Sequence, residues 1–533
     1  MWGERRSSFV LMAVLIACAA SASAQSSQDL DRACAAVGRL NLPQTHITKT
    51  DAIHPSGEYG VPGTDKGTVS GDRWYQGKGG PLVRVHRAFC RVAGVIDPAI
   101  HFETWLPLEG WNGRFEGLGL GAFWGALPYA GMARALDAGY AVGGTDSGHQ
   151  SEFDDARWTL KDGALNSGVV GDWGYRSMHE MTVKSQAIVE AVYGRRAHHS
   201  YFAGCSSGGY QALTEAQRFP TDYDGILAGA PANYLTHLQA AQLAFGLATR
   251  VDPATNLEMP FDKLPMIHRA VLRACDAADG VTDGLIENPA ACRFDPAVLT
   301  CKGGDASDCL TPPQVQALKR IYGDVRTSDG RKIFPGLPMG SELEWKLMSS
   351  MQVGFAQTFY RYFVFQNPEW NYATMNIDRD VAFADEHIGK QLNSINADLR
   401  PFRDHGGKLI QYHGWADWGI TPYSSIDYFN TVVATVGGSM SDAARRDVQQ
   451  FHRLFMLPGV SHCSGGAGPD QFAGLTALEQ WVEQGKAPER IEAAKVVDGK
   501  TVRTRPLCPY PQAARYQGTG STDEAANFKC QLP

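Results

Sequence analysis

The chain has 533 residues, of which 44% are hydrophobic and 20% are charged, a balance typical of a globular protein with a substantial core. This length exceeds one ordinary domain, so we expect either two units or one domain with a large insertion. The net charge of −7 indicates no basic surface and argues against nucleic acid as a partner.

The N-terminus resembles an export signal. Two arginines precede an apolar run at residues 9–20, and Ala22-Ser23-Ala24 forms an A-x-A cleavage site, which predicts a signal peptide over residues 1–24. The run is too short to span a membrane, and no later segment reaches 18 apolar residues. We therefore expect a secreted or periplasmic protein. The alternative is a lipid anchor at Cys18, because Leu15-Ile16-Ala17-Cys18 resembles a lipobox.

The first part of the mature chain is expected to contain β-strands up to residues 91–96. A glycine-spaced run at residues 117–122 follows. A dinucleotide-binding loop is disfavoured here, because no βαβ unit with a later acidic residue follows. We interpret the run as a loop whose backbone N–H groups approach a ligand. A buried strand at 140–146 and a helix at 171–193 come next.

Residues 198–219 are predicted to form a strand, a sharp turn and a helix. Gly204-Cys205-Ser206-Ser207-Gly208 within them fits the G-x-S-x-G nucleophile elbow, which exposes a serine hydroxyl above a sheet. The alternative is a chance glycine-serine turn. Another short apolar strand follows at residues 225–229.

The alternation of strands and helices then stops and later resumes. Residues 232–405 contain short helices and aromatic clusters and are predicted to be a lid domain inserted between two parts of an α/β core, residues 25–231 and 406–533. Strands are expected again at 407–413 and 454–457. Both run into loops with polar residues, and ligands bind at such carboxyl ends of strands.

The chain order Ser206, Asp417, His462 is that of α/β-hydrolases. A serine hydroxyl needs an imidazole to take its proton, and a carboxylate must orient that imidazole. The negative charge that develops on the substrate needs backbone N–H donors, for which we predict Ser207 and Ala122 in the Gly121-Ala122 loop.

Ten cysteines follow the predicted signal, and their even number in an exported protein favours five disulfides. Zinc is the alternative, but there is no C-x-x-C pair. Proximity suggests the local pairs Cys275–Cys292, Cys301–Cys309 and Cys508–Cys530.

The predicted lid also contains an acidic loop at residues 275–285. Asp276, Asp279 and Asp283 are spaced so that they could wrap a hard cation with oxygen ligands. No glutamate follows at the twelfth position, so the loop is not an EF-hand. The alternative is an acidic surface turn.

Three motifs together resemble the tannase and feruloyl esterase family: Gly204-Cys205-Ser206-Ser207-Gly208-Gly209, His413-Gly414-Trp415-Ala416-Asp417 and Pro458-Gly459-Val460-Ser461-His462-Cys463. Residues 111–115 and 505–510 extend the likeness over most of the chain. The resemblance implies an α/β-hydrolase fold with a large inserted lid domain and a Ser206–His462–Asp417 triad. It also implies the disulfides Cys205–Cys463 and Cys34–Cys90. One departure is Ala122, where relatives usually have glycine.

The resemblance implies a structural calcium ion, held by the side chains of Asp276, Asp279 and Asp283 and the carbonyls of Val281 and Leu285. No organic cofactor is expected. The predicted activity is that of a serine carboxylic ester hydrolase acting on small-molecule esters of aromatic acids, hydroxycinnamic or hydroxybenzoic, as in feruloyl esterases. A tannase or a terephthalate-monoester hydrolase is the alternative within enzymes, and a catalytically inactive binding module is the alternative outside them.

The residues predicted to contact the substrate are His413, Phe355 and Trp415. His413 could instead support Asp417 or simply be packed at a strand end, and most of the aromatic residues at 355–370 are expected to form the core of the lid. Relatives that cleave terephthalate monoesters have an arginine three residues before a Gly-Phe pair. Met351 stands there in this chain, so we expect neutral esters to be preferred, unless Arg361 compensates.

Overall fold

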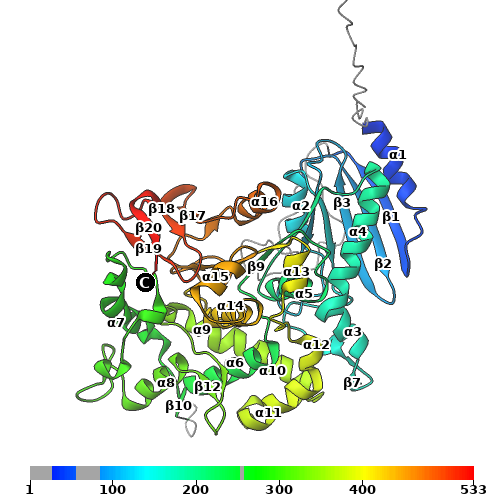
Figure 1. Cartoon of the computed structure of the whole chain (residues 1–533). Helices are drawn as coiled ribbons and strands as arrows, with labels where there is room; N and C mark the ends of the chain where they lie inside the picture. Colours follow the sequence, from blue (N-terminus) through cyan, green and yellow to red (C-terminus); the bar gives the residue numbers. More distant parts are fainter. Residues whose placement is uncertain (1–26, 56–84, 253–256, 533) are drawn as a thin grey trace, which may run out of the picture.

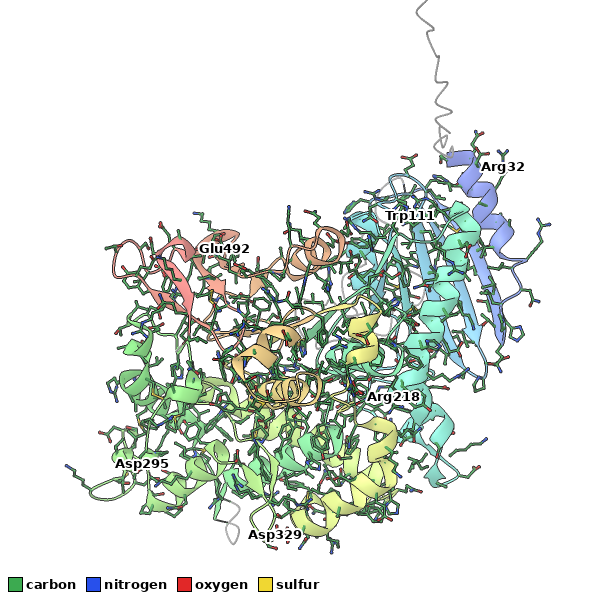
Figure 2. All side chains as sticks on the ribbon, viewed as in Figure 1. Arg32, Trp111, Arg218, Asp295, Asp329 and Glu492 are labelled. Atoms are coloured by element: carbon green, nitrogen blue, oxygen red, sulfur yellow. A yellow bond between two sulfur atoms is a disulfide. The ribbon has the colours of Figure 1, made fainter. Side chains whose placement is uncertain are left out.

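The computed structural model describes residues 27–252 and 257–532, except for 56–84. The predicted signal peptide and Cys18 lie outside the described residues and stay predictions. No helix among the residues described is long and apolar enough to cross a membrane. Charged side chains such as Arg32, Asp295 and Glu492 lie on the outside of the molecule (Figure 2).

The main sheet of the molecule is mixed and has nine strands. Its blue and cyan strands lie at the right of Figure 1. The pairs β1·β2, β2·β3 and β3·β5 at one side of the sheet are antiparallel. Every pair of adjacent strands from β5 to β15, at the other side, is parallel. The predicted α/β fold with a mostly parallel sheet is therefore confirmed. In sheet order the strands are β1 (Thr45–Ile53), β2 (Phe89–Ile96), β3 (Ile100–Pro107), β5 (Ala141–Thr145), β4 (Arg114–Leu118), β8 (His199–Cys205), β9 (Gly225–Gly229), β14 (Lys408–Gly414) and β15 (His452–Leu457).

Helices cover both faces of this sheet, as buried apolar strands require. One hydrophobic cluster joins the sheet to α1, α4, α5 and α14, and another joins it to α2 and α16. The helix expected over 171–193 is not a regular α-helix throughout, because a π-helical segment at Asp172–Arg176 lies between α3 and α4. The bounds are α1 (Ser27–Val37), α2 (Tyr129–Asp137), α3 (Ser167–Gly171), α4 (Ser177–Tyr193), α5 (Ser207–Arg218), α14 (Tyr423–Val436), α15 (Asp442–Val448) and α16 (Gly474–Gln484).

The segment between β9 and β14 adds no described strand to the central sheet. It forms most of the green and yellow helices in the lower part of Figure 1. It also contains two small antiparallel strand pairs, β10 (Arg250–Asp252) with β11 (Leu257–Glu258) and β12 (Val325–Arg326) with β13 (Lys332–Phe334). Its main helices are α6 (Leu235–Thr249), α7 (Leu264–Cys275), α8 (Pro312–Tyr322), α10 (Val353–Phe359), α11 (Ile377–Ala384) and α13 (Arg400–Asp404). The domain boundaries themselves stay predictions.

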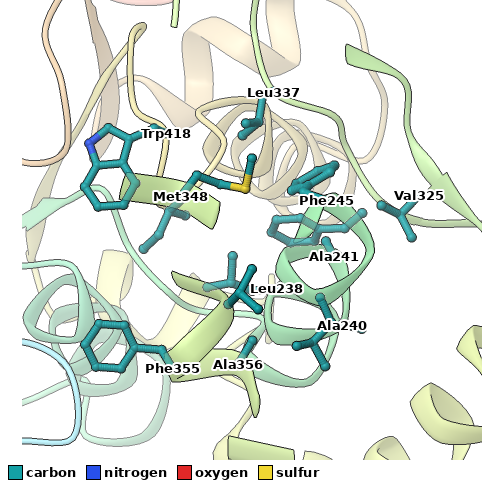
Figure 3. Packing of buried hydrophobic residues seen from close by; sticks show 14 of the residues in the cluster. Leu238, Ala240, Ala241, Phe245, Val325, Leu337, Met348, Phe355, Ala356 and Trp418 are labelled. Carbon is teal, nitrogen blue, oxygen red and sulfur yellow. The ribbon is translucent and has the colours of Figure 1, made fainter. Parts of the chain in front are cut away.

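This inserted segment has its own hydrophobic cluster, part of which is drawn in Figure 3. Phe355, Phe359 and Phe363 are buried in it, as expected for most of that aromatic run. Phe123 and Trp173 from the first part of the chain belong to the same cluster. The insertion is therefore packed onto the sheet domain through a continuous apolar contact.

The chain after β15 forms a small sheet, β16 (Gln471–Phe472), β17 (Ile491–Val497) and β18 (Lys500–Leu507), and a hairpin, β19 (Ala513–Tyr516) and β20 (Phe528–Gln531). Arg505 on β18 is paired with Asp283 of the insertion. The five disulfides of the structure are those expected: Cys34–Cys90, Cys205–Cys463, Cys275–Cys292, Cys301–Cys309 and Cys508–Cys530.

Candidate active site

Ser206 lies at a sharp turn between β8 and α5, in a strained backbone conformation with φ of 65° and ψ of −121°. Neighbouring glycines make this turn possible. A Cβ on Gly204 would lie 2.5 Å from the carbonyl oxygen of Gly208, and one on Gly209 would lie 2.1 Å from that of Gly229. The predicted elbow is therefore a real strand-turn-helix unit that presents the Ser206 hydroxyl at the end of the sheet.

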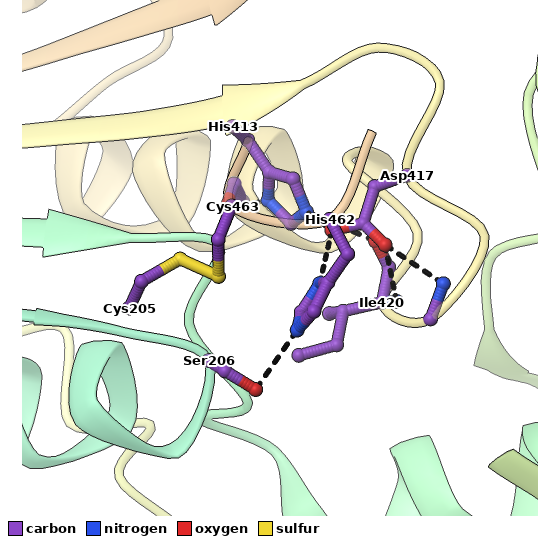
Figure 4. The surroundings of a disulfide bond; sticks show 9 residues. Cys205, Ser206, His413, Asp417, Ile420, His462 and Cys463 are labelled. Carbon is purple, nitrogen blue, oxygen red and sulfur yellow. Dashed lines mark hydrogen bonds and ion pairs between the residues drawn. A yellow bond between two sulfur atoms is a disulfide. The ribbon is translucent and has the colours of Figure 1, made fainter. Parts of the chain in front are cut away.

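The three predicted triad residues are brought together although they are far apart in sequence (Figure 4). The Nε2 atom of His462 is 2.9 Å from Ser206 Oγ, and its Nδ1 atom is 2.7 Å from Asp417 Oδ2. Since the carboxylate only accepts, Nδ1 carries the proton and Nε2 accepts from the serine hydroxyl. All three residues are buried. This arrangement can move a proton from serine to imidazole.

Both carboxylate oxygens of Asp417 have hydrogen-bond donors next to them. Oδ1 accepts from the backbone N–H groups of Gly419 at 2.7 Å and Ile420 at 2.9 Å, and Oδ2 also faces His413 Nε2 at 3.1 Å. Burial alone would raise the pKa of the Asp417 carboxyl, but the imidazoles of His462 and His413 together hold that pKa well below its ordinary value. Asp417 is thus ionised and fixed in orientation.

The structure places His413, one of the three residues predicted to contact the substrate, away from the pocket at Ser206. Its side chain is fully buried and does not line the pocket at Ser206. Its Nε2 faces both Asp417 Oδ2 and the carbonyl oxygen of Ile420, at 2.9 Å from the latter, so Nε2 carries the proton, while Nδ1 accepts from Ser425 Oγ at 2.8 Å. His413 therefore orients Asp417, which was the other role considered for it.

The two predicted oxyanion donors, Ser207 and Ala122, line the same pocket as Ser206. Ser207 is the first residue of α5, where backbone N–H groups have no partner within the helix. Ala122 has a φ of 51°, a conformation that favours glycine and that this alanine nevertheless adopts. Its loop is fixed to α5, because Gln211 Oε1 accepts from the N–H of Leu120 at 2.8 Å.

A pocket opens beside Ser206, between the sheet and the insertion. Of the predicted contact residues, Phe355 lines it, but Trp415 does not. Trp415 packs edge-on against Tyr423, with ring centres 5.5 Å apart, and lines a different cavity. The structure therefore does not bring Trp415 to the pocket at Ser206. Trp418, the residue after Asp417, has its ring centre 6.4 Å from that of His462.

Sequence reasoning missed much of this pocket. Its described lining is Ala122, Phe123, Ser206, Ser207, Ala232, Leu235, Leu238, Gln239, Gln242, Gln352, Phe355 and Ile420. Four of these lie on one face of α6, at positions 235, 238, 239 and 242. That spacing is visible in the sequence, but α6 is apolar almost all round, so the pattern does not reveal which face meets the pocket.

The aspartate side chains of the acidic loop are buried, although residues 277, 278, 280 and 282 of the loop are exposed, and the carboxylates accept from the loop's own backbone. Asp276 accepts from the N–H of Gly284 at 2.9 Å, Asp279 from that of Val281 at 3.1 Å, and Asp283 from that of Leu285 at 3.2 Å. Within the described residues, no three histidine, cysteine, aspartate or glutamate side chains are grouped so that they could hold a metal ion. The donor chemistry of the loop fits calcium, but the carboxylates do not face a common centre.

The strand order, the nucleophile elbow and the acid and histidine after later strands define an α/β-hydrolase. The family model described as tannase and feruloyl esterase matches residues 83–531. The chain is 36% identical to an uncharacterized esterase of Xanthomonas campestris pv. campestris, over 93% of this chain and 91% of that protein. It is 34% identical to the mono(2-hydroxyethyl) terephthalate hydrolase of Piscinibacter sakaiensis, over 83% of this chain and 85% of that protein.

The comparison with solved structures agrees with the family match. The crystal structure of feruloyl esterase B from Aspergillus oryzae matches with a TM-score of 0.84 and 29% identity, covering 94% of this chain and all of that one. The chain belongs to the tannase and feruloyl esterase family, and it is a carboxylic ester hydrolase.

Proposed function

We propose that the protein is an exported serine esterase that cleaves esters of aromatic acids through a Ser206–His462–Asp417 triad. The observation that carries this proposal is the continuous relay from Ser206 Oγ to His462 at 2.9 Å and on to Asp417 at 2.7 Å, at the edge of a pocket that both candidate oxyanion donors also line. The intact relay argues against an inactive binding module.

The mechanism follows from this geometry. His462 Nε2 takes the proton of Ser206 as Oγ attacks the ester carbonyl carbon, and the oxyanion formed is stabilised by the N–H groups of Ser207 and Ala122. His462 then gives its proton to the departing alcohol, leaving an acyl-serine. Water, activated by the same imidazole, hydrolyses the acyl group and restores Ser206. Asp417 stabilises the imidazolium in both steps.

Support for an aromatic acyl group comes from the pocket. Phe123 and Phe355 lie edge to face with ring centres 5.8 Å apart, and leucine side chains of α6 complete an apolar wall. The relatives include a feruloyl esterase and a terephthalate-monoester hydrolase. No ionisable side chain occurs among the described lining residues. This favours a neutral acyl group, as in feruloyl esterases or tannases, over a terephthalate.

The central test combines one variant with a panel of esters. Ser206→Ala should stay folded but lose activity by roughly four to six orders of magnitude, because a triad acts as a unit. A serine-directed phosphonate should label Ser206 in the parent only, and the parent should hydrolyse methyl esters of cinnamic and benzoic acids. Labelling of another residue, or robust turnover by the variant, would refute the triad. Turnover of aliphatic esters alone would refute the substrate class.

We further propose that the acidic loop binds a structural calcium ion. The carboxylates of Asp276, Asp279 and Asp283 are buried, and Asp283 is paired with Arg505 and Arg503, whose two positive charges do not balance three carboxylates. The side chains of these aspartates would have to turn from their backbone N–H partners toward one centre, where they would bind the ion together with the carbonyls of Val281 and Leu285. The five disulfides support the export part of the proposal, since such bonds persist in oxidising compartments.

A further inference from the structure

Two glutamines of the insertion lie in the candidate acyl pocket with buried, unused hydrogen-bonding groups. Gln239 and Gln242 are on the same face of α6, and both line the pocket that contains Ser206. Gln239 is only 6% exposed and Gln242 only 2%. Neither Oε1 atom has a hydrogen-bond partner among the described residues. A buried carbonyl oxygen without a donor is unfavourable in a folded protein and calls for an explanation.

The orientation of the Gln242 amide is fixed by a neighbour. Its Nε2 group donates to the backbone carbonyl oxygen of Gly419 at 2.6 Å. A carbonyl can only accept, so the Nε2 group must face Gly419, and flipping the amide would bring two acceptors together. Oε1 of Gln242 is therefore held as an acceptor on the other side of the amide.

The position of the pocket relative to the relay indicates which half of an ester it receives. Its described lining includes Ser206 and both candidate oxyanion donors, but not His462. The departing alcohol must be next to His462, which protonates it, whereas the acyl group continues from the carbonyl carbon bound to Ser206. The glutamines therefore face the acyl side of the bound ester.

We propose that Gln242 and Gln239 are specificity-determining residues that accept a hydrogen bond from a hydroxyl group on the acyl ring. The substrates would accordingly be esters of phenolic acids rather than of unsubstituted or carboxylated aromatic acids. A phenolic hydroxyl is neutral and donates, so it satisfies the unused acceptors, whereas a carboxylate has only acceptor atoms and would face the fixed carbonyl oxygen of Gln242. This inference rests on the proposed function and refines it.

The test compares three methyl esters that share a scaffold: 4-hydroxycinnamate, 4-methoxycinnamate and cinnamate. The parent should favour the hydroxylated ester over the methoxylated one by about tenfold or more in kcat/KM, because sites built for a hydroxyl donor reject analogues that lack it. In Gln239→Met and Gln242→Met, which keep the side-chain volume, this ratio should fall to within about threefold of one. Gln450→Leu, an exposed change, should keep the parent's ratio.

A second pair of esters locates the hydroxyl. The ratio for 2-(4-hydroxyphenyl)ethyl cinnamate over 2-phenylethyl cinnamate, in which the hydroxyl is on the alcohol, should be close to one in every variant. If Gln242→Met fails to fold, because it loses the bond to Gly419, Gln239→Met decides the matter, since it has no such contact to lose.

The outcomes separate the two proposals. Hydrolysis of all three cinnamates by the parent without preference, or an unchanged preference in the folded glutamine variants, overturns this inference and leaves the proposed function intact. Absence of turnover with every aromatic ester overturns both.

Discussion

Cys205 and Cys463, the sequence neighbours of Ser206 and His462, are joined by a disulfide with their Cα atoms 6.0 Å apart (Figure 4). The two cysteines are 258 residues apart in the chain, and the whole insertion lies between them. The bridge therefore fixes the distance between the nucleophile at the end of β8 and the histidine loop after β15, two strands that are separated in the sheet by β9 and β14.

Removing this bridge should affect both stability and turnover. The chain-entropy model gives about 5–6 kcal/mol for a loop of this length, and measured values are often smaller. The Cys205→Ser, Cys463→Ser variant should unfold at a lower temperature and, where still folded, should lose about tenfold or more in kcat, because Ser206 and His462 are less well fixed. Thermal unfolding and steady-state kinetics at low temperature measure the two effects.

The matched control is Cys34→Ser, Cys90→Ser, which removes a bridge between α1 and β2. The same model gives about 4 kcal/mol for its shorter loop. This control should lose a similar amount of stability but keep kcat. Equal losses of kcat in both double variants would mean that the Cys205–Cys463 bridge only stabilises the fold and has no specific effect on the active site.

His413 should act through Asp417 rather than on the substrate. His413→Leu removes one donor from Asp417 Oδ2 and should lower kcat by roughly tenfold to a hundredfold with little change in KM, because the pocket does not contain His413. His413→Gln, whose amide can still donate, should recover part of the loss. A rise in KM with unchanged kcat would contradict this role and favour contact with the substrate.

The fold and the triad could be predicted from sequence because their signals are local. The elbow around Ser206 requires glycines within a few residues, and Asp417 and His462 each follow an apolar strand directly. The positions of the His413 and Trp415 side chains are harder to predict, because both residues stand in a motif at the end of a strand, close to Asp417. Their side chains turn into the protein, and only the packing against Tyr423 and the hydrogen bond to Ile420 shows that they do.

The pocket could not be predicted for a different reason. It is assembled from an elbow, an oxyanion loop and the inserted helix α6, so its composition depends on how the insertion sits on the sheet. Met351, which stands where relatives that cleave terephthalate monoesters have an arginine, illustrates this. The neighbouring Gln352 lines the pocket, while Met351 packs against the core of the insertion. Side chains of adjacent residues on a helix point in directions that differ by about a quarter of a turn.

Calcium removal should destabilise the parent without changing the chemistry. A ligand present at a hundred times its dissociation constant adds about 2.7 kcal/mol of stability. A chelator should therefore lower Tm by several degrees, with kcat unchanged at temperatures where the protein stays folded. Asp279→Asn should be less stable and insensitive to the chelator, whereas the exposed Asp329→Asn should respond like the parent. A parent shown to be free of metal, with an unchanged melting curve, would leave only an acidic turn.

The choice between neutral and charged acyl groups gives the last prediction. Arg361, which was considered as a partner for a substrate carboxylate, donates instead to the carbonyl oxygen of Trp370 at 2.7 Å and is not among the residues lining the pocket. A carboxylate there would lose its hydration without gaining a cation, at a cost of several kcal/mol if fully buried. We therefore expect methyl 4-hydroxycinnamate to exceed mono(2-hydroxyethyl) terephthalate in kcat/KM by at least a hundredfold at pH 8.

This preference should depend on pH with a defined sign. The carboxyl of the terephthalate ester has an ordinary pKa of roughly 4, so its neutral form increases about tenfold for each unit by which the pH falls between 8 and 5. Changes of the free enzyme with pH affect kcat/KM of both substrates equally and cancel in their ratio. The ratio of kcat/KM should therefore move toward the terephthalate ester as the pH falls. A ratio that stays constant over this range, or one that favours the charged ester at pH 8, would show that the pocket supplies a cationic partner.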